Sequence, residues 1–266
     1  MNIAKLSSIL NIQCFYAAAY YPHNLHFLWA AYSMEGRSQA AIEVAWKVAA
    51  SVSLEMIEHY PVVEFFKTIP LLALTRFGQW GAVLIQLPPS EHLEFSHGIW
   101  RYARAIAQSK LGDLAAARSE YFSLTKIREA ASLAVLDQKG YPATLLLKIA
   151  DRLVLGEIFM AQEDYANAIT AFKEAVDLQD QLPYTEPPFW YYPTQLALGK
   201  ALLKADDFAQ AGMIYLDNLK HYPKNGWTLY GLKQSLHAQG KDSSKIQKEF
   251  DHTWQYADIE LIASIF

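Results

Sequence analysis

Two histidines near the beginning of the chain are spaced so that they could share a ligand. His23 and His26 are three residues apart, and on a helix such a pair lies on one face with Cβ atoms about 5–6 Å apart. Two imidazoles in this arrangement can bind one transition metal ion such as Zn, Fe, Mn or Cu, with His97 and Glu186 as candidate ligands from distant segments. In the alternative interpretation, Pro22-His23-Asn24 begins a helix and His26 packs through a hydrogen bond.

A second candidate is the segment Glu186–Pro193, in which two prolines precede the consecutive rings Trp190, Tyr191 and Tyr192. The prolines predict a loop that leads into a helix start, and Glu186 would favour the positive end of that helix. The rings indicate either the aromatic wall of a groove, able to stack on a peptide or a cation, or a hydrophobic lid over a long loop. The sequence leaves both interpretations open.

A third candidate is Arg76, four residues before Trp80. Its guanidinium could seat a carboxylate; alternatively it pairs with Glu64 or with the end of a helix. Tyr102, Asn24 and His97 complete the set of candidate binding residues. The chain has no Ser–His–Asp spacing, GxxxxGK[ST] loop or GxGxxG motif, so the sequence favours binding over catalysis.

The elements that must position these residues repeat along the chain. In several segments a polar or glycine turn is followed by a small residue, and usually by an aromatic residue four positions later. We expect each turn to join two helices, the small residue to let them cross closely, and the ring to fill the space one turn on. Glycines twelve residues before two of the small positions would admit the partner helix, and Pro223 would stop a helix. The small residues are Ala41, Ala117, Ala168 and Ala211, the rings Tyr121, Phe172 and Tyr215, and the glycines Gly156 and Gly199.

This pattern resembles the tetratricopeptide repeat (TPR), most clearly over residues 146–223. The resemblance implies an all-α, TPR-like α-solenoid, a right-handed superhelix of antiparallel helix pairs, with about five to six pairs in residues 22–266 and an apolar helix in residues 1–21. Residues 50–96 are expected to hold an extra helix pair. In such units the first helix lines the concave surface, which would place His23, His26 and Tyr102 there.

Further segments, including Pro22-His23-Asn24 and Asn225-Gly226-Trp227, resemble a set of bacterial TPR proteins without an assigned activity. Those relatives are commonly longer, so the chain looks like their C-terminal half. Residues 3–20 would then cap a cut surface or support self-association. The resemblance implies a fold but no reaction.

Composition narrows the classes of partner. Hydrophobic residues make up 52% of the chain, enough for a core, and the formal net charge of −4 argues against nucleic acid. A single cysteine, Cys14, excludes a disulfide within the chain. Residues 6–34 carry no charged side chain, but Pro22 and several polar residues interrupt them, so we expect no membrane span.

The absence of a recognisable signal peptide predicts a cytoplasmic protein. We therefore expect a TPR-type binding or scaffold protein without a cofactor, whose concave, aromatic- and histidine-lined groove binds a peptide or protein. The alternative is a metal-binding protein or metal-dependent enzyme that uses His23, His26, His97 and Glu186.

Overall fold

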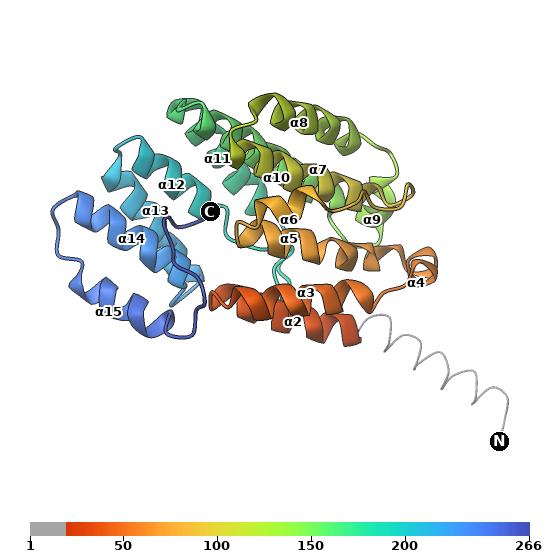
Figure 1. The fold of residues 1–266 in the computed structure, drawn as a ribbon, viewed down its shortest axis with the longest axis horizontal. Helices are drawn as coiled ribbons and strands as arrows, with labels where there is room; N and C mark the ends of the chain where they lie inside the picture. Colours follow the sequence, from red (N-terminus) through yellow and green to blue (C-terminus); the bar gives the residue numbers. More distant parts are fainter. Residues whose placement is uncertain (1–19) are drawn as a thin grey trace, which may run out of the picture.

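The computed structural model describes residues 20–266, and this part of the chain is all-α, without a β-strand (Figure 1). The predicted helix of residues 1–21 and the predicted self-association surface of residues 3–20 fall almost entirely outside the described residues. In chain order the helices are α2 (Tyr21–Met34), α3 (Ser38–Ala50), α4 (Leu54–His59), the 3-10 helix η2 (Pro61–Thr68), α5 (Ile69–Arg76), α6 (Trp80–Leu84), α7 (Glu94–Leu111), α8 (Leu114–Arg128), α9 (Leu133–Gln138), α10 (Ala143–Ala161), α11 (Tyr165–Gln179), α12 (Gln195–Lys204), α13 (Phe208–His221), α14 (Gly226–Ala238) and α15 (Ser244–Thr253).

Six helical hairpins, α2–α3, α5–α6, α7–α8, α10–α11, α12–α13 and α14–α15, are closed by the same turn. One turn residue has a positive φ, and the next N–H donates to the carbonyl oxygen five residues earlier, which satisfies a free carbonyl at the helix end. The turn residues are Gly36, Gly78, Gly112, Glu163, Asp206 and Gly240.

Three of the second helices also begin with the same cap. Asp113, Asp164 and Asp207 each accept a hydrogen bond from the backbone N–H three residues later, at 3.0, 3.2 and 3.1 Å. An aspartate in this position satisfies one of the unpaired N–H groups of the first helical turn. The polar turns in the sequence therefore both end one helix and start the next.

The predicted close crossing is confirmed in two of the hairpins, α10–α11 and α12–α13. Gly156 on α10 lies directly under the Phe172 ring of α11, and Gly199 on α12 lies under the Tyr215 ring of α13, so a Cβ at either glycine would overlap the ring. The small residues Ala168 and Ala211 are completely buried beside them. In each hairpin the glycine, which has no side chain, leaves room for the large ring of the partner helix, so the two helices pack closely.

The region between the α2–α3 and α7–α8 hairpins is divided into shorter helices than a regular helix pair. It contains the short helices α4 and α6, together with η2 and α5. Pro61 and Pro70 stand at the first turns of η2 and α5, where a missing N–H is tolerated. The expected extra pair over residues 50–96 is thus reduced to the α5–α6 hairpin and two short helices.

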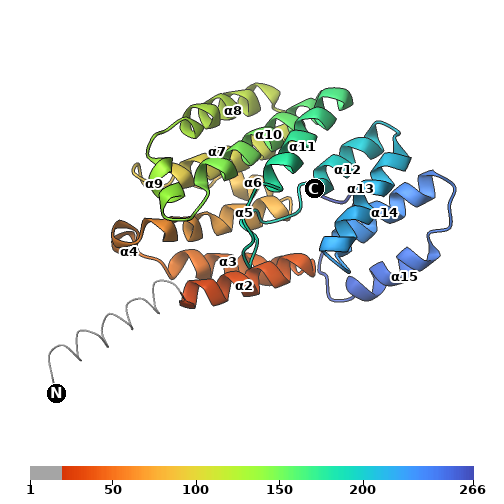
Figure 2. The ribbon, with the colours of Figure 1, turned by 180° about the vertical axis from the view of Figure 1, so that it is seen from behind.

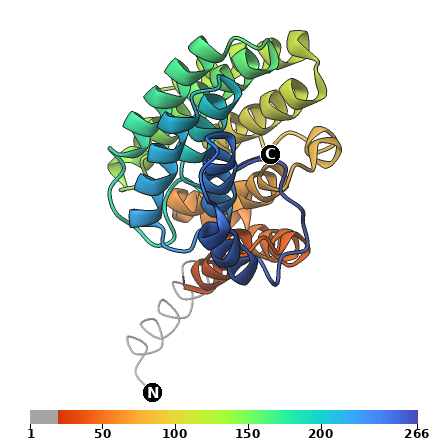
Figure 3. The ribbon, with the colours of Figure 1, turned by 90° about the vertical axis from the view of Figure 1, so that its left-hand side faces the viewer.

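The helices form an arc whose last hairpin returns to the first (Figure 3). The indole N–H of Trp227 on α14 donates to the carbonyl of Ser33 on α2 at 3.1 Å. The Trp254 ring packs against both Gly36 and Gly226. The Asp258 carboxylate then accepts from the backbone N–H groups of Ser38 and Gln39 at 2.6 and 3.0 Å, and so caps α3 from the far end of the sequence.

The connection between α11 and α12 is long and runs toward α2 before it turns back (Figure 2). We call residues 183–193 the 183–193 loop. It is held at its end by Gln179, whose side chain accepts from the N–H and hydroxyl of Thr194 at 2.7 and 2.8 Å and donates to the Tyr192 carbonyl at 3.1 Å. Within the described residues, no helix is long and apolar enough to cross a bilayer.

Candidate functional site

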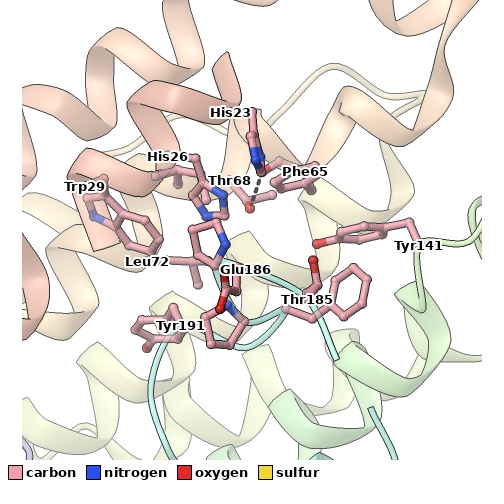
Figure 4. Close-up of a pocket in the computed structure, with 14 residues that line it drawn as sticks. His23, His26, Trp29, Phe65, Thr68, Leu72, Tyr141, Thr185, Glu186 and Tyr191 are labelled. Carbon is pink, nitrogen blue, oxygen red and sulfur yellow. Dashed lines mark hydrogen bonds between the residues drawn. The ribbon is translucent and has the colours of Figure 1, made fainter. Parts of the chain in front are cut away.

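A cavity of about 70 Å³ lies between α2, the η2–α5 segment and the 183–193 loop (Figure 4). It brings His23, His26, Glu186 and Tyr191 of the predicted site together. The other residues that line it are Trp29, Phe65, Thr68, Ile69, Leu72, Tyr141, Thr185, Pro187, Pro188 and Phe189.

Both histidines of the cavity lie on helix α2 (Figure 4). Pro22 stands in the first turn of α2, and the spacing of three residues places His23 and His26 on the same face. His26 is buried and stacks on Trp29, with ring centroids 5.3 Å apart. His23 is half-buried, and its ring meets Phe27 edge-on at 4.8 Å.

Burial keeps His26 uncharged. It lowers the pKa of His26 from 6.5 to about 3, and the neighbouring His23 adds a smaller effect in the same direction. The neutral ring retains one nitrogen that donates and one that accepts a hydrogen bond. Within the described residues neither nitrogen has a hydrogen-bond partner, so His26 can offer both functions to a ligand.

The 183–193 loop forms the opposite wall. Thr185 and Glu186 face α2 across the cavity, and the Tyr184 hydroxyl donates to the exposed Glu186 carboxylate (Figure 4). Among the described residues, Glu186 is the one acidic side chain that lines the cavity, and no Lys or Arg lines it.

The third wall is aromatic and includes Tyr141, a residue that the sequence analysis missed. Its ring stacks on Phe65 at 4.9 Å and meets Phe189 edge-on at 5.5 Å. Burial raises the pKa of Tyr141 well above its ordinary value, so its hydroxyl stays protonated. The only sequence signal was its place before Pro142 at the start of α10.

Behind this cavity lies a separate aromatic cluster around Arg76, which is only 2% exposed. The guanidinium carbon lies 3.7 Å from the centre of the Trp227 ring and 5.3 Å from that of Tyr192. Burial lowers the pKa of Arg76 to about 10, so the group is still a cation at neutral pH. Neither of its terminal nitrogens has a hydrogen-bond partner within the described residues.

The predicted pairing of Arg76 with Glu64 is therefore wrong. Glu64 accepts instead from the backbone N–H of Ser96 at 2.8 Å. Arg76 stacks on Trp227 from the distant α14, because the arc of helices brings that ring onto the end of α5.

Tyr102, Trp190 and Tyr192 are core residues of the same cluster. The Tyr102 hydroxyl is 2.9 Å from that of Tyr191, and the Tyr102 ring meets Trp190 edge-on at 5.4 Å. Because Trp190 and Tyr192 are buried, their rings support the 183–193 loop and do not stand open to solvent. Tyr191 links this cluster to the cavity.

The remaining predicted residues lie elsewhere. His97 is on α7 beside Trp100, with ring centroids 6.5 Å apart, and it does not line the cavity. Asn24 is exposed on α2. In residues 20–266 no three His, Cys, Asp or Glu side chains are grouped as a metal ion requires, so metal binding stays a prediction.

Two further hollows continue the cavity along the 183–193 loop. One, of about 160 Å³, includes Trp29, Pro188 and Tyr191 and reaches Trp190. The other, of about 540 Å³, includes Pro188, Trp190 and Tyr222 and shares Thr185, Glu186 and Phe189 with the first cavity. The indole N–H groups of Trp29 and Trp190 are both buried without a partner in the described part of the chain. We call these three neighbouring hollows, all of which Pro188 lines, the 183–193 groove.

Comparison with protein-family models and with curated proteins found no match to this chain. The fold and the site therefore define its class by themselves: an all-α protein of repeated helical hairpins with a groove along one long loop.

Proposed function

We propose that the protein is a TPR-like α-solenoid binding protein whose 183–193 groove takes an extended peptide segment of a partner protein. The repeated turns support the solenoid part of this proposal, because six hairpins share one closing geometry. The matched glycine and ring pairs of α10–α11 and α12–α13 support it as well, since they follow the small-residue and aromatic offsets of the TPR pattern.

The observation that carries the binding function is that three neighbouring hollows share lining residues along one loop. Pro188 lines all three hollows, so a ligand could pass from the histidines of α2 to Tyr222 without leaving the protein surface. This shape suits an extended chain better than a compact metabolite. Aromatic walls would supply binding energy, and scattered polar groups would fix the register.

The charge of the groove supports a peptide over a nucleic acid. Among residues 20–266, no Lys or Arg lines the three hollows, whereas Glu186 lines two of them. Phosphate recognition depends on cationic side chains.

The test is a selection of peptides from a displayed random library, followed by titration calorimetry with the full chain. Pro188→Trp should weaken the selected peptides by more than about tenfold, because the new ring would fill the point where the hollows meet. Pro88→Trp is the matched control: it also lies in a Pro-Pro pair and is exposed, but it does not line the groove. Equal affinities of the two variants, or a library that yields no peptide, would refute the proposal.

A further inference from the structure

We infer that the cavity at the α2 end of the 183–193 groove binds an alkylammonium group, such as a lysine side chain or a free N-terminus. This inference rests on the proposed function, because it specifies the chemical group that one end of the groove would bind. It is carried by the charge, the rings and the unpaired acceptors of the cavity.

The charge of the cavity selects a cation. Glu186 supplies a carboxylate, while no Lys or Arg of the described residues lines the cavity. An anionic group would meet this carboxylate without a compensating Lys or Arg. An ammonium group would be attracted to it.

The aromatic walls of the cavity suit a cation that has lost its hydration shell. Phe65, Tyr141 and Phe189 contact one another in series, through a stacked pair at 4.9 Å and an edge-on pair at 5.5 Å. Aromatic faces attract ammonium groups, most strongly where the cation is shielded from solvent. An exposed ion pair alone contributes little, so these rings would add the larger share of the affinity.

Hydrogen-bond acceptors complete the site. His26 is buried at the cavity and has no partner in the described part of the chain. The Tyr141 hydroxyl and the Thr185 hydroxyl approach the same space (Figure 4). An ammonium group has three N–H donors and no acceptor, and the ring nitrogen and hydroxyl oxygens here can accept them. The volume of about 70 Å³ suits a compact head group, with the rest of the ligand continuing along the groove.

The experiment is titration calorimetry of the full chain at pH 7 with small probes. Nα-acetyl-lysinamide offers a side-chain ammonium, alaninamide offers an α-ammonium, and Nα-acetyl-norleucinamide has a similar apolar stem without charge. We expect one ammonium probe to bind about tenfold more tightly than the norleucine compound. Whether lysinamide or alaninamide binds assigns the source of the ammonium group.

Two variants test the carboxylate. Glu186→Gln should reduce this preference about threefold, because an exposed ion pair contributes little, and Glu186→Lys should abolish it through like-charge repulsion. Because Glu186 is exposed, neither change should disturb the fold, which circular dichroism checks. Glu163→Gln, at the exposed α10–α11 turn, is the matched control and should retain the preference.

Three results would overturn the inference: equal affinities for the charged and uncharged probes, no binding of any probe at millimolar concentration, or an unchanged preference in Glu186→Gln. Zn²⁺ binding that is lost in His23→Gln, without ammonium binding, would replace the inference with the metal site. Selected peptides that bind the groove without an ammonium preference would refute this inference alone, whereas ammonium binding without any selected peptide would refute the proposed function alone.

Discussion

The imidazole of His26 couples the candidate site to the stability of the fold. Its ring is uncharged in the folded protein because burial lowers its pKa from 6.5 to about 3. In the unfolded chain His26 takes up a proton near its ordinary pKa. The unfolded state thus binds more protons between these two values, and stability should fall as the pH falls through that window.

We expect the free energy of unfolding of the wild type to fall by about 1–2 kcal/mol more than that of His26→Gln between pH 6.5 and pH 5. Urea unfolding at several pH values measures this difference. His252→Gln, which removes an exposed histidine, is the control and should follow the wild type. Parallel pH profiles for the wild type and His26→Gln would contradict the assigned charge state.

Arg76 presents the opposite case, a charged group in the core that has no carboxylate partner in the described part of the chain. Its planar guanidinium stacks on Trp227 at 3.7 Å, a geometry that a lysine ammonium cannot reproduce. We expect Arg76→Lys to lose about 2 kcal/mol or more of stability, and Arg76→Met to lose less, because methionine keeps the packing and needs no hydration. Urea unfolding of both variants tests this order, and the reverse order would contradict it.

The sequence could predict part of the candidate site for local reasons. The spacing of His23 and His26 determines that they share a face of α2. Glu186 lies opposite them only because of the path of the 183–193 loop, and no local sequence pattern predicts that path. Tyr141 was missed because nothing in its own segment distinguishes a cavity wall from an ordinary core ring.

At the scale of the elements, the hairpins were the most predictable feature. The residues that close α10–α11 and α12–α13, with their small positions and rings, lie within one segment of chain each. Local sequence can therefore specify them. The stretch that contains α4, η2, α5 and α6 was less predictable, because its prolines indicate breaks without saying how short each helix is.

A substitution at Gly156 tests whether its close packing against Phe172 stabilises the α10–α11 hairpin. In Gly156→Ala the new methyl group would overlap the Phe172 ring, so we expect a loss of about 1–3 kcal/mol. Gly81→Ala is the matched control on α6, where a Cβ meets nothing within 4 Å and should add about 0.5–1 kcal/mol. Thermal unfolding measures both changes, and a Gly156→Ala protein as stable as the wild type would refute the proposed packing.

At the scale of the whole molecule, the return of the last hairpin to the first could not be read from the sequence. The contacts that make it join residues far apart: Trp227 and Ser33 are 194 positions apart, and Asp258 and Ser38 are 220 apart. The repeat pattern describes only neighbours in a stack. It therefore contains no information about how far the arc curves.

Asp258 tests this closure. Asp258→Ala removes the cap of α3 and should cost about 1 kcal/mol. Hydrogen exchange should then become faster in the first turn of α3, although the change lies 220 residues away from Ser38. Glu260→Ala, two residues on and exposed, is the control. Unchanged exchange in α3 of the Asp258→Ala protein would show that the contact contributes nothing.

The closure by residues 254–258 also affects where the protein should be cleaved first. Stacked repeats ordinarily fray at their terminal units, which proteases then attack. Here α2–α3 and α14–α15 protect each other through Trp227, Trp254 and Asp258. Cleavage of the described residues by a protease specific for large apolar side chains should therefore begin not in these hairpins but in exposed loops, after Ile85, which is 77% exposed, or after Tyr184, which is 87% exposed.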